Sequence, residues 1–405
     1  MSSKIFFILS IIFMILATRG FGYVNFGDNW PIVIFYIIFG YYSFRHRKFI
    51  GRQRLNFNRQ AKGLILIPFL CLITMTIEGT NNLAGHPKVV VAYLVSTTFL
   101  LYYFLHGIQL REKDLLKVLI GVALIVFIIQ VYQQFNYDKA VFGIWSDQVM
   151  AETGSDMKVE IRNGILRYRI PATCFTLFAI FYYWDRFLHK RKLKYFLLFA
   201  IFCVSIYLTL TRQLIAITLI GIALLPIFSS RTSLPKKIGY MILTIGVLAI
   251  IYNYSDVLFG DLIQKTQEQS GEDNIRNYSF AYYFDATTKN WYKCLLGSGH
   301  QSHEIAYGAQ FNFWPDDVGF MGEWHFYGLF WLILYVYILY SILIKNYRRV
   351  PNYIKIFVFV TLLDCFMIFP YRNAYEFYLW ASILYICDLH INNSPLALNY
   401  DRKRH

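Results

Sequence analysis

The sequence predicts an all-α polytopic membrane protein with about twelve transmembrane helices and one large extracytoplasmic loop. Hydrophobic residues fill 57% of the 405 positions and charged residues only 16%, a balance too apolar for one soluble domain. The apolar residues occur in blocks of roughly 14–20, the length class that crosses a bilayer. The basic residues gather in alternate connections between these blocks, as they do in membrane proteins with a fixed orientation.

The apolar blocks define twelve predicted spans. Pro68 and Pro226 lie inside two of them and are expected to kink them, because proline removes a helical hydrogen bond. No internal repeat is visible, so the inverted repeats of many transporters find no support. In chain order the spans cover 5–18, 30–44, 64–77, 89–110, 118–133, 170–184, 195–211, 213–229, 238–254, 319–344, 356–370 and 375–388.

The charge distribution predicts the orientation. With a cytoplasmic N-terminus, one face carries 26 of the 39 Lys and Arg residues and only five acids. This is the positive-inside pattern, and it places both termini in the cytoplasm. The formal net charge of +15 is therefore an orientation signal. The lipid bilayer is the expected partner, and nucleic acid is not.

The span pattern divides the chain into three parts. Residues 1–254 form an N-terminal bundle of nine spans, and residues 255–318 form the large extracytoplasmic loop. Residues 319–405 hold the last three spans and a cytoplasmic tail. The loop mixes charge, histidine, glycine and aromatic residues between apolar spans. A polar segment held in this way is where chemistry at a membrane surface would be sited.

Cysteine and histidine spacing gives no sign of a metal site or a disulfide framework. Of the six cysteines, only Cys294 lies in a predicted aqueous loop. His300, His303 and His325 lack the spacing of zinc ligands. We therefore expect neither a metal nor a cofactor.

Arginines at the predicted outer face are candidates for binding an anion. Arg162, Arg167 and Arg169 precede the span that opens at Ile170, and arginine is suited to binding carboxylate or phosphate. The alternative is a solvated cluster paired with nearby acids. Arg212 lies at the outer turn between two hydrophobic helices. It either extends to the interface or faces the bundle with a function.

The large loop contains a predicted helix over 275–289, with Asn274 or Asp273 as its cap. Gly297-Ser298-Gly299 follows as a tight turn whose N–H groups are able to contact phosphate, although most such turns are only turns. Asp316-Asp317 sits at the start of a span, where a helix N-terminus stabilises carboxylates. The two acids are either a helix cap or functional. Trp291, Trp314 and Trp324 are interface residues or platforms for sugar rings.

Three segments, in this order, resemble the O-antigen polymerase and ligase superfamily, which comprises the Wzy-type polysaccharide polymerases and their lipid A-core ligase relatives. The first is Leu208-Thr209-Leu210-Thr211-Arg212-Gln213, with an arginine at the outer tip of a helical hairpin. The second is Arg276 followed by Leu296-Gly297-Ser298-Gly299. The third runs from Asp317-Val318-Gly319 through Tyr327-Gly328-Leu329. Together they cover about a third of the chain.

This resemblance implies a GT-C-like glycosyltransferase architecture and a specific reaction. The donor is a glycan on undecaprenyl pyrophosphate, the acceptor is a sugar hydroxyl, and no metal is used. The enzyme acts at the outer face of the bacterial inner membrane. A chain-length regulator is a further partner that the resemblance leaves open.

The resemblance also assigns roles to residues of this chain. Arg212 and Arg276, with help from Arg167 or Arg169 and from the turn at Gly297 and Gly299, would bind the pyrophosphate. Asp317 is the first candidate for the general base. The alternatives for the base are Asp316, His325 and His303.

One departure bears on the type of enzyme. Ligases of this group show His-Asn at the head of the last motif, where this chain has Asp316-Asp317. This favours a polymerase over a ligase.

A polyisoprenyl-glycan flippase is the alternative from another class. Flippases would normally concentrate ionisable residues in their spans, whereas here the charges gather in the outward loops and Asp364 is the clearest mid-span ionisable residue. We expect Asp364 to face the bundle in a structural role. A metal-dependent enzyme using polyprenyl-phosphate sugars would carry paired acids in its first outward loop, where only Asp28 is found.

Overall fold

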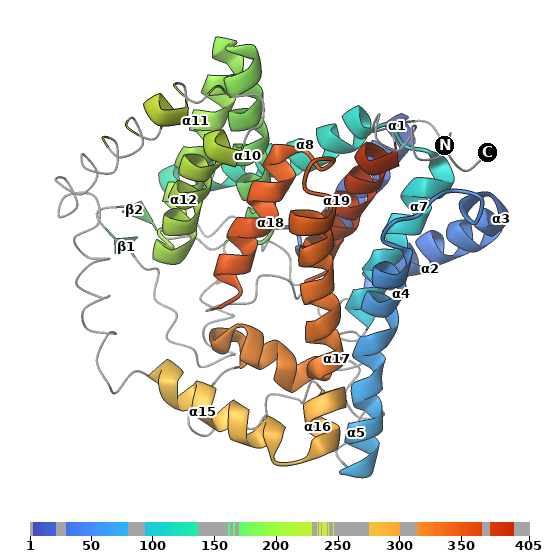
Figure 1. The fold of residues 1–405 in the computed structure, drawn as a ribbon. Helices are drawn as coiled ribbons and strands as arrows, with labels where there is room; N and C mark the ends of the chain where they lie inside the picture. Colours follow the sequence, from blue (N-terminus) through green and yellow to red (C-terminus); the bar gives the residue numbers. More distant parts are fainter. Residues whose placement is uncertain are drawn as a thin grey trace.

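The computed structural model is almost entirely helical (Figure 1). One short hairpin interrupts the helices: β1 (Ile161–Arg162) pairs antiparallel with β2 (Ile165–Leu166). The structure describes residues 3–21, 30–79, 94–136, 161–162, 165–166, 170–228, 275–299, 313, 315–366 and 373–392, together with scattered positions between 233 and 246.

Most of the helices are long and apolar. In chain order the α-helices are α1 (Ser3–Ala17), α2 (Trp30–Arg45), α3 (Arg47–Ile50), α4 (Asn58–Leu66), α5 (Cys71–Ile77), α7 (Leu100–Ile108), α8 (Glu112–Phe135), α10 (Thr173–Lys190), α11 (Leu193–Leu208), α12 (Arg212–Phe228), α15 (Ile275–Thr288), α16 (Trp291–Leu296), α17 (Phe320–Tyr340), α18 (Asn352–Asp364) and α19 (Ala374–Asn392). Three 3₁₀ turns, η1 (Ile67–Leu70), η2 (Val95–Phe99) and η4 (Pro315–Val318), and a π-helix, η5 (Ser341–Lys345), continue or precede them.

A described helix overlaps each predicted span except 238–254, which lies largely outside the described residues. Among the residues that the structure describes, three helices are suited by length and composition to crossing a membrane: Asn58–Ile77, Glu112–Phe135 and Phe320–Lys345. A helical membrane protein is therefore consistent with the structure, and the count of twelve spans stays a prediction. The kink expected at Pro68 takes the form of the 3₁₀ turn η1 inside the first of these three.

The start of α8 differs from the sequence prediction. Residues 111–117 were expected to be a loop, but the helix begins at Glu112. Glu112 and Asp114 lie in its first turn, where negative charge interacts favourably with the helix dipole. Asp114 also pairs with Arg111 at 2.8 Å and with Lys117 at 3.0 Å. These local pairs compensate the charge and let an apolar helix extend into a charged connection.

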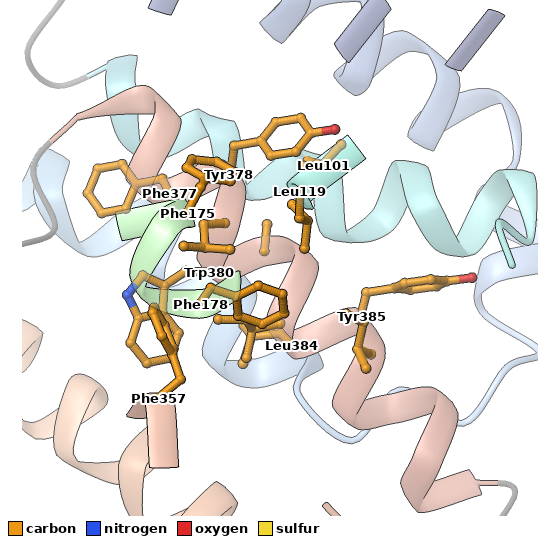
Figure 2. Packing of buried hydrophobic residues seen from close by; sticks show 14 of the residues in the cluster. Leu101, Leu119, Phe175, Phe178, Phe357, Phe377, Tyr378, Trp380, Leu384 and Tyr385 are labelled. Carbon is orange, nitrogen blue, oxygen red and sulfur yellow. The ribbon is translucent and has the colours of Figure 1, made fainter. Parts of the chain in front are cut away.

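The core lies between α19 and the helices around it. Figure 2 shows aromatic and aliphatic side chains from several helices packed together, among them Phe178, Phe357 and Trp380. Tyr378 is fully buried, and its hydroxyl donates to Ser10 Oγ at 2.7 Å. A buried hydroxyl needs such a partner because its desolvation is otherwise uncompensated. The bond joins α19 to the first helix of the chain.

A buried polar network joins α7 and α19 near the C-terminal end of α19. The Asp388 carboxylate accepts from the Tyr102 hydroxyl and, at 3.0 Å, from the Asn56 backbone N–H. His106 Nε2 lies 3.2 Å from the same carboxylate. Asp388 is completely buried, so these contacts replace the water that it loses. They fix residues 51–57 against the bundle.

Helix α17 is broken at Gly328, whose φ of 79° and ψ of 175° are not helical. The sequence predicted one continuous span over 319–344, and this prediction is wrong in that respect. The first part of α17, Phe320–Tyr327, lies across the lower end of the bundle in Figure 1, and the second part runs upward through it. The break lets a short helix sit at the end of the bundle, next to α15 and α16.

Candidate functional site

The Gly297–Gly299 turn packs directly against the break in α17. The Ser298 N–H donates to His325 O at 2.7 Å, and the Gly299 N–H donates to Phe326 O at 3.0 Å. These carbonyls end the short first part of α17 and need donors because the helix stops there. The turn therefore closes the broken end of the helix.

Two glycines make this close approach possible. Gly297 and Gly328 both have positive φ, of 83° and 79°. A Cβ on Gly297 would lie 2.3 Å from Phe326 O, and a Cβ on Gly328 would lie 2.3 Å from Leu295 O. Glycine is thus required at both positions for conformation and for space.

The same geometry corrects the expected role of the turn. The N–H groups of Gly297, Ser298 and Gly299 donate to carbonyls of the chain, Gly297 to Lys293 O at 2.9 Å. They are therefore engaged within the chain instead of facing a phosphate. Gly297 and Gly299 thus do not belong to the pyrophosphate-binding set. They position α16 and the end of the short helix.

The tip of the α11–α12 hairpin is compact and buried. Leu210 has a φ of 46° and no exposed surface, an unusual backbone conformation for a branched-chain residue. Thr209 Oγ1 accepts from the Thr211 N–H at 3.3 Å. Arg212 then begins α12 with a half-buried side chain. The tip holds this arginine at the end of the bundle.

Gln213 connects the hairpin tip to the end of α18. Its amide donates to the Asp364 carboxylate, and also to the Asp364 backbone carbonyl at 3.2 Å. Asp364 therefore faces the bundle and is paired, as expected from the sequence. The next residue, Cys365, contacts the first part of α17, because its carbonyl oxygen accepts from the Phe320 N–H at 2.9 Å. The start of α12 therefore lies close to the start of α17.

Two further acids lie near this end, and sequence reasoning did not assign them a role. Glu323, in the short first part of α17, has no exposed surface and lies within electrostatic range of Glu376. Glu376 begins α19 and accepts from the Asn373 N–H at 2.7 Å. A fully buried carboxyl is stable only when it is hydrogen-bonded or uncharged. The available signal was a glutamate inside an apolar run, the same signal that identified Asp364.

His325 is packed between α17 and α15. Its side chain is 4% exposed, and its Nδ1 lies 3.0 Å from Thr287 Oγ1. Its ring centroid is 4.9 Å from that of Tyr283. The Tyr283 hydroxyl donates to Phe313 O at 2.9 Å, and burial raises the pKa of this phenol. His325 therefore helps to hold α15 in place.

Asp317 is exposed and lies in the 3₁₀ turn η4. It does not lie in the first turn of α17, because Gly319 precedes that helix with a φ of 53°. The expected stabilisation by a helix N-terminus therefore does not apply in the form predicted. The Trp324 indole donates to Cys294 O at 2.8 Å, so this tryptophan connects α17 to α16. The backbone of Asp316 is in the same turn, and its side chain is outside the described residues.

The loop helix predicted over 275–289 is confirmed as α15. Arg276 is in its first turn and is exposed, while Ser279, Tyr283 and Thr287 form the buried face. This face packs on η4 and α17. The helix therefore presents Arg276 away from the packed face, at the same end of the molecule as the hairpin tip.

Two contacts fix α16 to Glu78, the residue that follows α5. Lys293 Nζ lies 2.7 Å from Glu78 Oε1, and the Tyr292 hydroxyl donates to the same oxygen at 3.2 Å. Both ions of the pair are more than four-fifths buried. Trp291 on the same helix is 74% exposed and remains a candidate for contact with a sugar or the interface.

Some of the predicted site residues therefore lie at the same end of the bundle, and others lie outside the described residues. Arg212, Asp317 and Arg276 lie on segments connected through α18, α17 and α15 at one end of the bundle (Figure 1). Arg167, Arg169 and His303 are outside the described residues. Their proposed roles remain predictions from sequence.

Comparison with known proteins identifies no relative. No family model, curated protein or solved structure matches this chain. Function therefore has to be inferred from the placement and chemistry of the side chains.

Proposed function

We propose that this protein is a glycosyltransferase that polymerises undecaprenyl-pyrophosphate-linked oligosaccharide repeat units into a surface polysaccharide at the outer face of the bacterial inner membrane. One observation carries the proposal. Arg276 and the exposed Asp317 lie on α15 and η4, which pack on each other and on α17, and Arg212 begins α12, which packs on α18. The end of α18 in turn contacts the start of α17, so the three side chains belong to connected segments at one end of the bundle. Two arginines and an accessible carboxylate match what transfer from a lipid pyrophosphate requires.

In the proposed reaction the acceptor hydroxyl oxygen attacks the anomeric carbon of the donor. The bond between that carbon and the pyrophosphate oxygen breaks, and the pyrophosphate leaves with its electron pair. Arg212 and Arg276 stabilise the negative charge of the leaving group, since the guanidinium provides several fixed donors. Arg167 and Arg169 are the additional arginines proposed from sequence.

Asp317 is the proposed general base that takes the proton of the acceptor hydroxyl. Its side chain is exposed at the end where Arg212 and Arg276 lie. His325 is 4% exposed with Nδ1 at Thr287, and Glu323 has no exposed surface. A base must come within hydrogen-bond reach of the hydroxyl, which favours the accessible carboxylate. Asp316 and His303 remain the other candidates from sequence.

Polymerisation is preferred to transfer onto lipid A-core. The acids Asp316 and Asp317 stand where ligases of the resembling group have His-Asn. His325, the nearest histidine that the structure describes, packs inside the protein. It is therefore a poor substitute for the ligase histidine.

A reconstituted assay tests the function. The purified protein in liposomes is supplied with a purified lipid-linked repeat unit and no other acceptor, and products are resolved as a ladder on a gel. We expect polymer in the presence of EDTA, because the sequence shows no metal-ligand spacing. Product that appears only when lipid A-core is added would establish the ligase alternative. Absence of glycosidic product with either acceptor would contradict both.

Variants in the same assay test the base. Asp317→Asn keeps the shape of the side chain and removes the base, so we expect at least about a hundredfold loss of rate. Asp285→Asn, an exposed acid on α15, is the matched control and should keep full activity. If Asp317→Asn is active while Glu323→Gln or His325→Ala is folded and inactive, the base is the buried residue instead.

A further inference from the structure

A basic cavity lies at the end of the bundle opposite to α15 and α16. It has a volume of about 560 Å³, and the segments around it are the end of α10, the connection from α17 to α18, and the end of α19. It is independent of the proposed active site. Its basic lining residues are Arg186, Lys190, Arg348, Arg349 and Lys355, and its acidic ones are Glu112 and Asp185.

The acids of the cavity have partners of their own. Glu112 contacts His390 Nε2 at 3.0 Å and accepts from the Tyr353 hydroxyl at 3.2 Å. Asp185 lies 3.5 Å from His189 Nδ1 and within electrostatic range of Lys355. Within the described part of the chain, no ion pair joins Arg348, Arg349 or Lys190 to a carboxylate. These three cations therefore leave an excess of positive charge at the cavity.

Lys355 makes the floor of the cavity positive. It is only 5% exposed, and its Nζ lies 4.0 Å from the centroid of the Tyr347 ring. A cation held over an aromatic face is fixed in position instead of moving freely in solvent. Arg348 and Lys190, by contrast, are exposed at the surface. The cavity thus combines one buried cation, Lys355, with two exposed cations, Arg348 and Lys190.

A second cavity adjoins the first. It has a volume of about 550 Å³ and shares Tyr347, Arg348 and Arg349 with the basic cavity. Its other lining residues are the apolar Leu343 and Ile344 and the polar Lys345 and Asn346. Ile344 is 66% exposed, which suits contact with hydrocarbon. Leu343 and Ile344 belong to the π-helix Ser341–Lys345. A π-helix is a local widening of a helix that occurs frequently at functional sites. Positive charge and apolar surface therefore meet along one short connection.

We propose that this pair of cavities binds an anionic phospholipid, with the phosphate headgroup in the basic cavity and an acyl chain against Leu343 and the exposed Ile344 of the second cavity. Basic pockets between helices at the cytoplasmic side of membrane proteins hold anionic headgroups in this way. The location agrees with the orientation predicted from sequence, which puts residues 186–194 and 345–355 on the cytoplasmic face. A free phosphate shares the headgroup chemistry but makes no contact with the apolar side chains of Leu343 and Ile344.

Native mass spectrometry of the full-length protein tests this site. The protein is released from micelles containing equal amounts of phosphatidylglycerol and phosphatidylcholine, and the bound lipid is counted. We expect a preference for phosphatidylglycerol that Arg348→Gln/Arg349→Gln reduces on the order of tenfold to thirtyfold. The matched control Arg47→Gln/Lys48→Gln removes two exposed cations from another basic connection and should keep the preference.

Two further arms decide between outcomes. Millimolar inorganic phosphate should not displace phosphatidylglycerol, and displacement would show a site for the phosphate group alone. An equal loss of the phosphatidylglycerol preference in the pocket and control variants would show that the preference depends only on the overall positive charge, and would overturn the proposal. An unchanged preference in the pocket variant would overturn it as well. If the double variant fails to fold, Lys190→Gln, at the exposed mouth, gives the same readout with a smaller loss.

Discussion

At the scale of single residues, the backbone geometry of a few glycines determines the structure around the broken helix α17 more than side-chain chemistry does. Gly297 and Gly328 face each other so closely that neither has room for a Cβ. Gly319 has the same restriction against Cys365 O, at 2.3 Å. Gly297 was predicted in a turn and Gly319 and Gly328 within a span, but all three are positions where two backbones meet. Their conformations fix where the short helix lies.

Gly328→Ala tests this restriction. The added methyl group meets Leu295 O at 2.3 Å, and the residue has a φ of 79°, so the variant should lose about 2 kcal/mol or more of stability. A thermal melt in detergent should show a lower Tm. Gly239→Ala is the control, because its Cβ meets nothing within 4 Å. Equal Tm values for the two variants would contradict the packing described for the break.

The role of the Gly297–Gly299 turn could not be predicted from the sequence. A Gly-x-Gly turn offers its N–H groups to whatever lies opposite, and the sequence does not show that Phe326 O and His325 O lie there. Asp364 was more predictable, since a mid-span acid must face the interior. Its actual partner, Gln213, is 151 residues away, and only the packing of α12 on α18 brings the two together.

At the scale of elements, the apolar blocks located the helices but not their breaks or their pairings. Each predicted span within the described residues overlaps a helix, because a long apolar run has no other way to satisfy its backbone in a membrane. The break at Gly328 lies in an apolar run like any other, so the pattern gave no sign of it. The position of α15 also depends on contacts between segments that are distant in the sequence, such as the contact of Thr287 with His325.

The contact between α12 and α18 gives a prediction at this scale. Gln213→Leu removes the donor to the Asp364 carboxylate and should cost about 1–3 kcal/mol of stability. Asp364→Asn keeps a side-chain acceptor for the same amide, so it should fold and make polymer. Combining Gln213→Leu with Asp364→Leu should lower Tm by less than the sum of the single changes, since both remove one interaction. A folded but inactive Asp364→Asn would give this residue a chemical role.

At the scale of the whole molecule, the two ends of the bundle differ in character. One end has the broken helix, α15 and α16, and the opposite end has the last residues of α10 and α19 (Figure 1), which line the basic cavity. The asymmetry of basic residues in the sequence predicts this difference, because it assigns them to the cytoplasmic face. How the helices close around the core could not be predicted, since packing depends on shape and not on composition.

Topology reporters test the orientation. A reporter fused after Gly271 should behave as extracytoplasmic, and one fused after Lys237 as cytoplasmic, because the distribution of 39 Lys and Arg residues orients the chain. Protease accessibility of the Gly271 fusion in spheroplasts provides a second reading. Both reporters on one side would overturn the orientation, and the assignment of Arg276 to the outer face with it.

The most direct test of the central claim is the rate of polymer synthesis from purified lipid-linked repeat units by Arg212→Ala, Arg276→Ala and the double variant. Each lost charge-assisted contact should cost about 1.5–3 kcal/mol, or roughly a tenfold to hundredfold loss of rate. Lysine at either position should restore little, because it keeps the charge without the planar donor geometry. Lys289→Ala, an exposed cation just beyond α15, is the control and should stay active. Wild-type rates in a well-folded double variant would contradict the claim that these arginines bind the pyrophosphate.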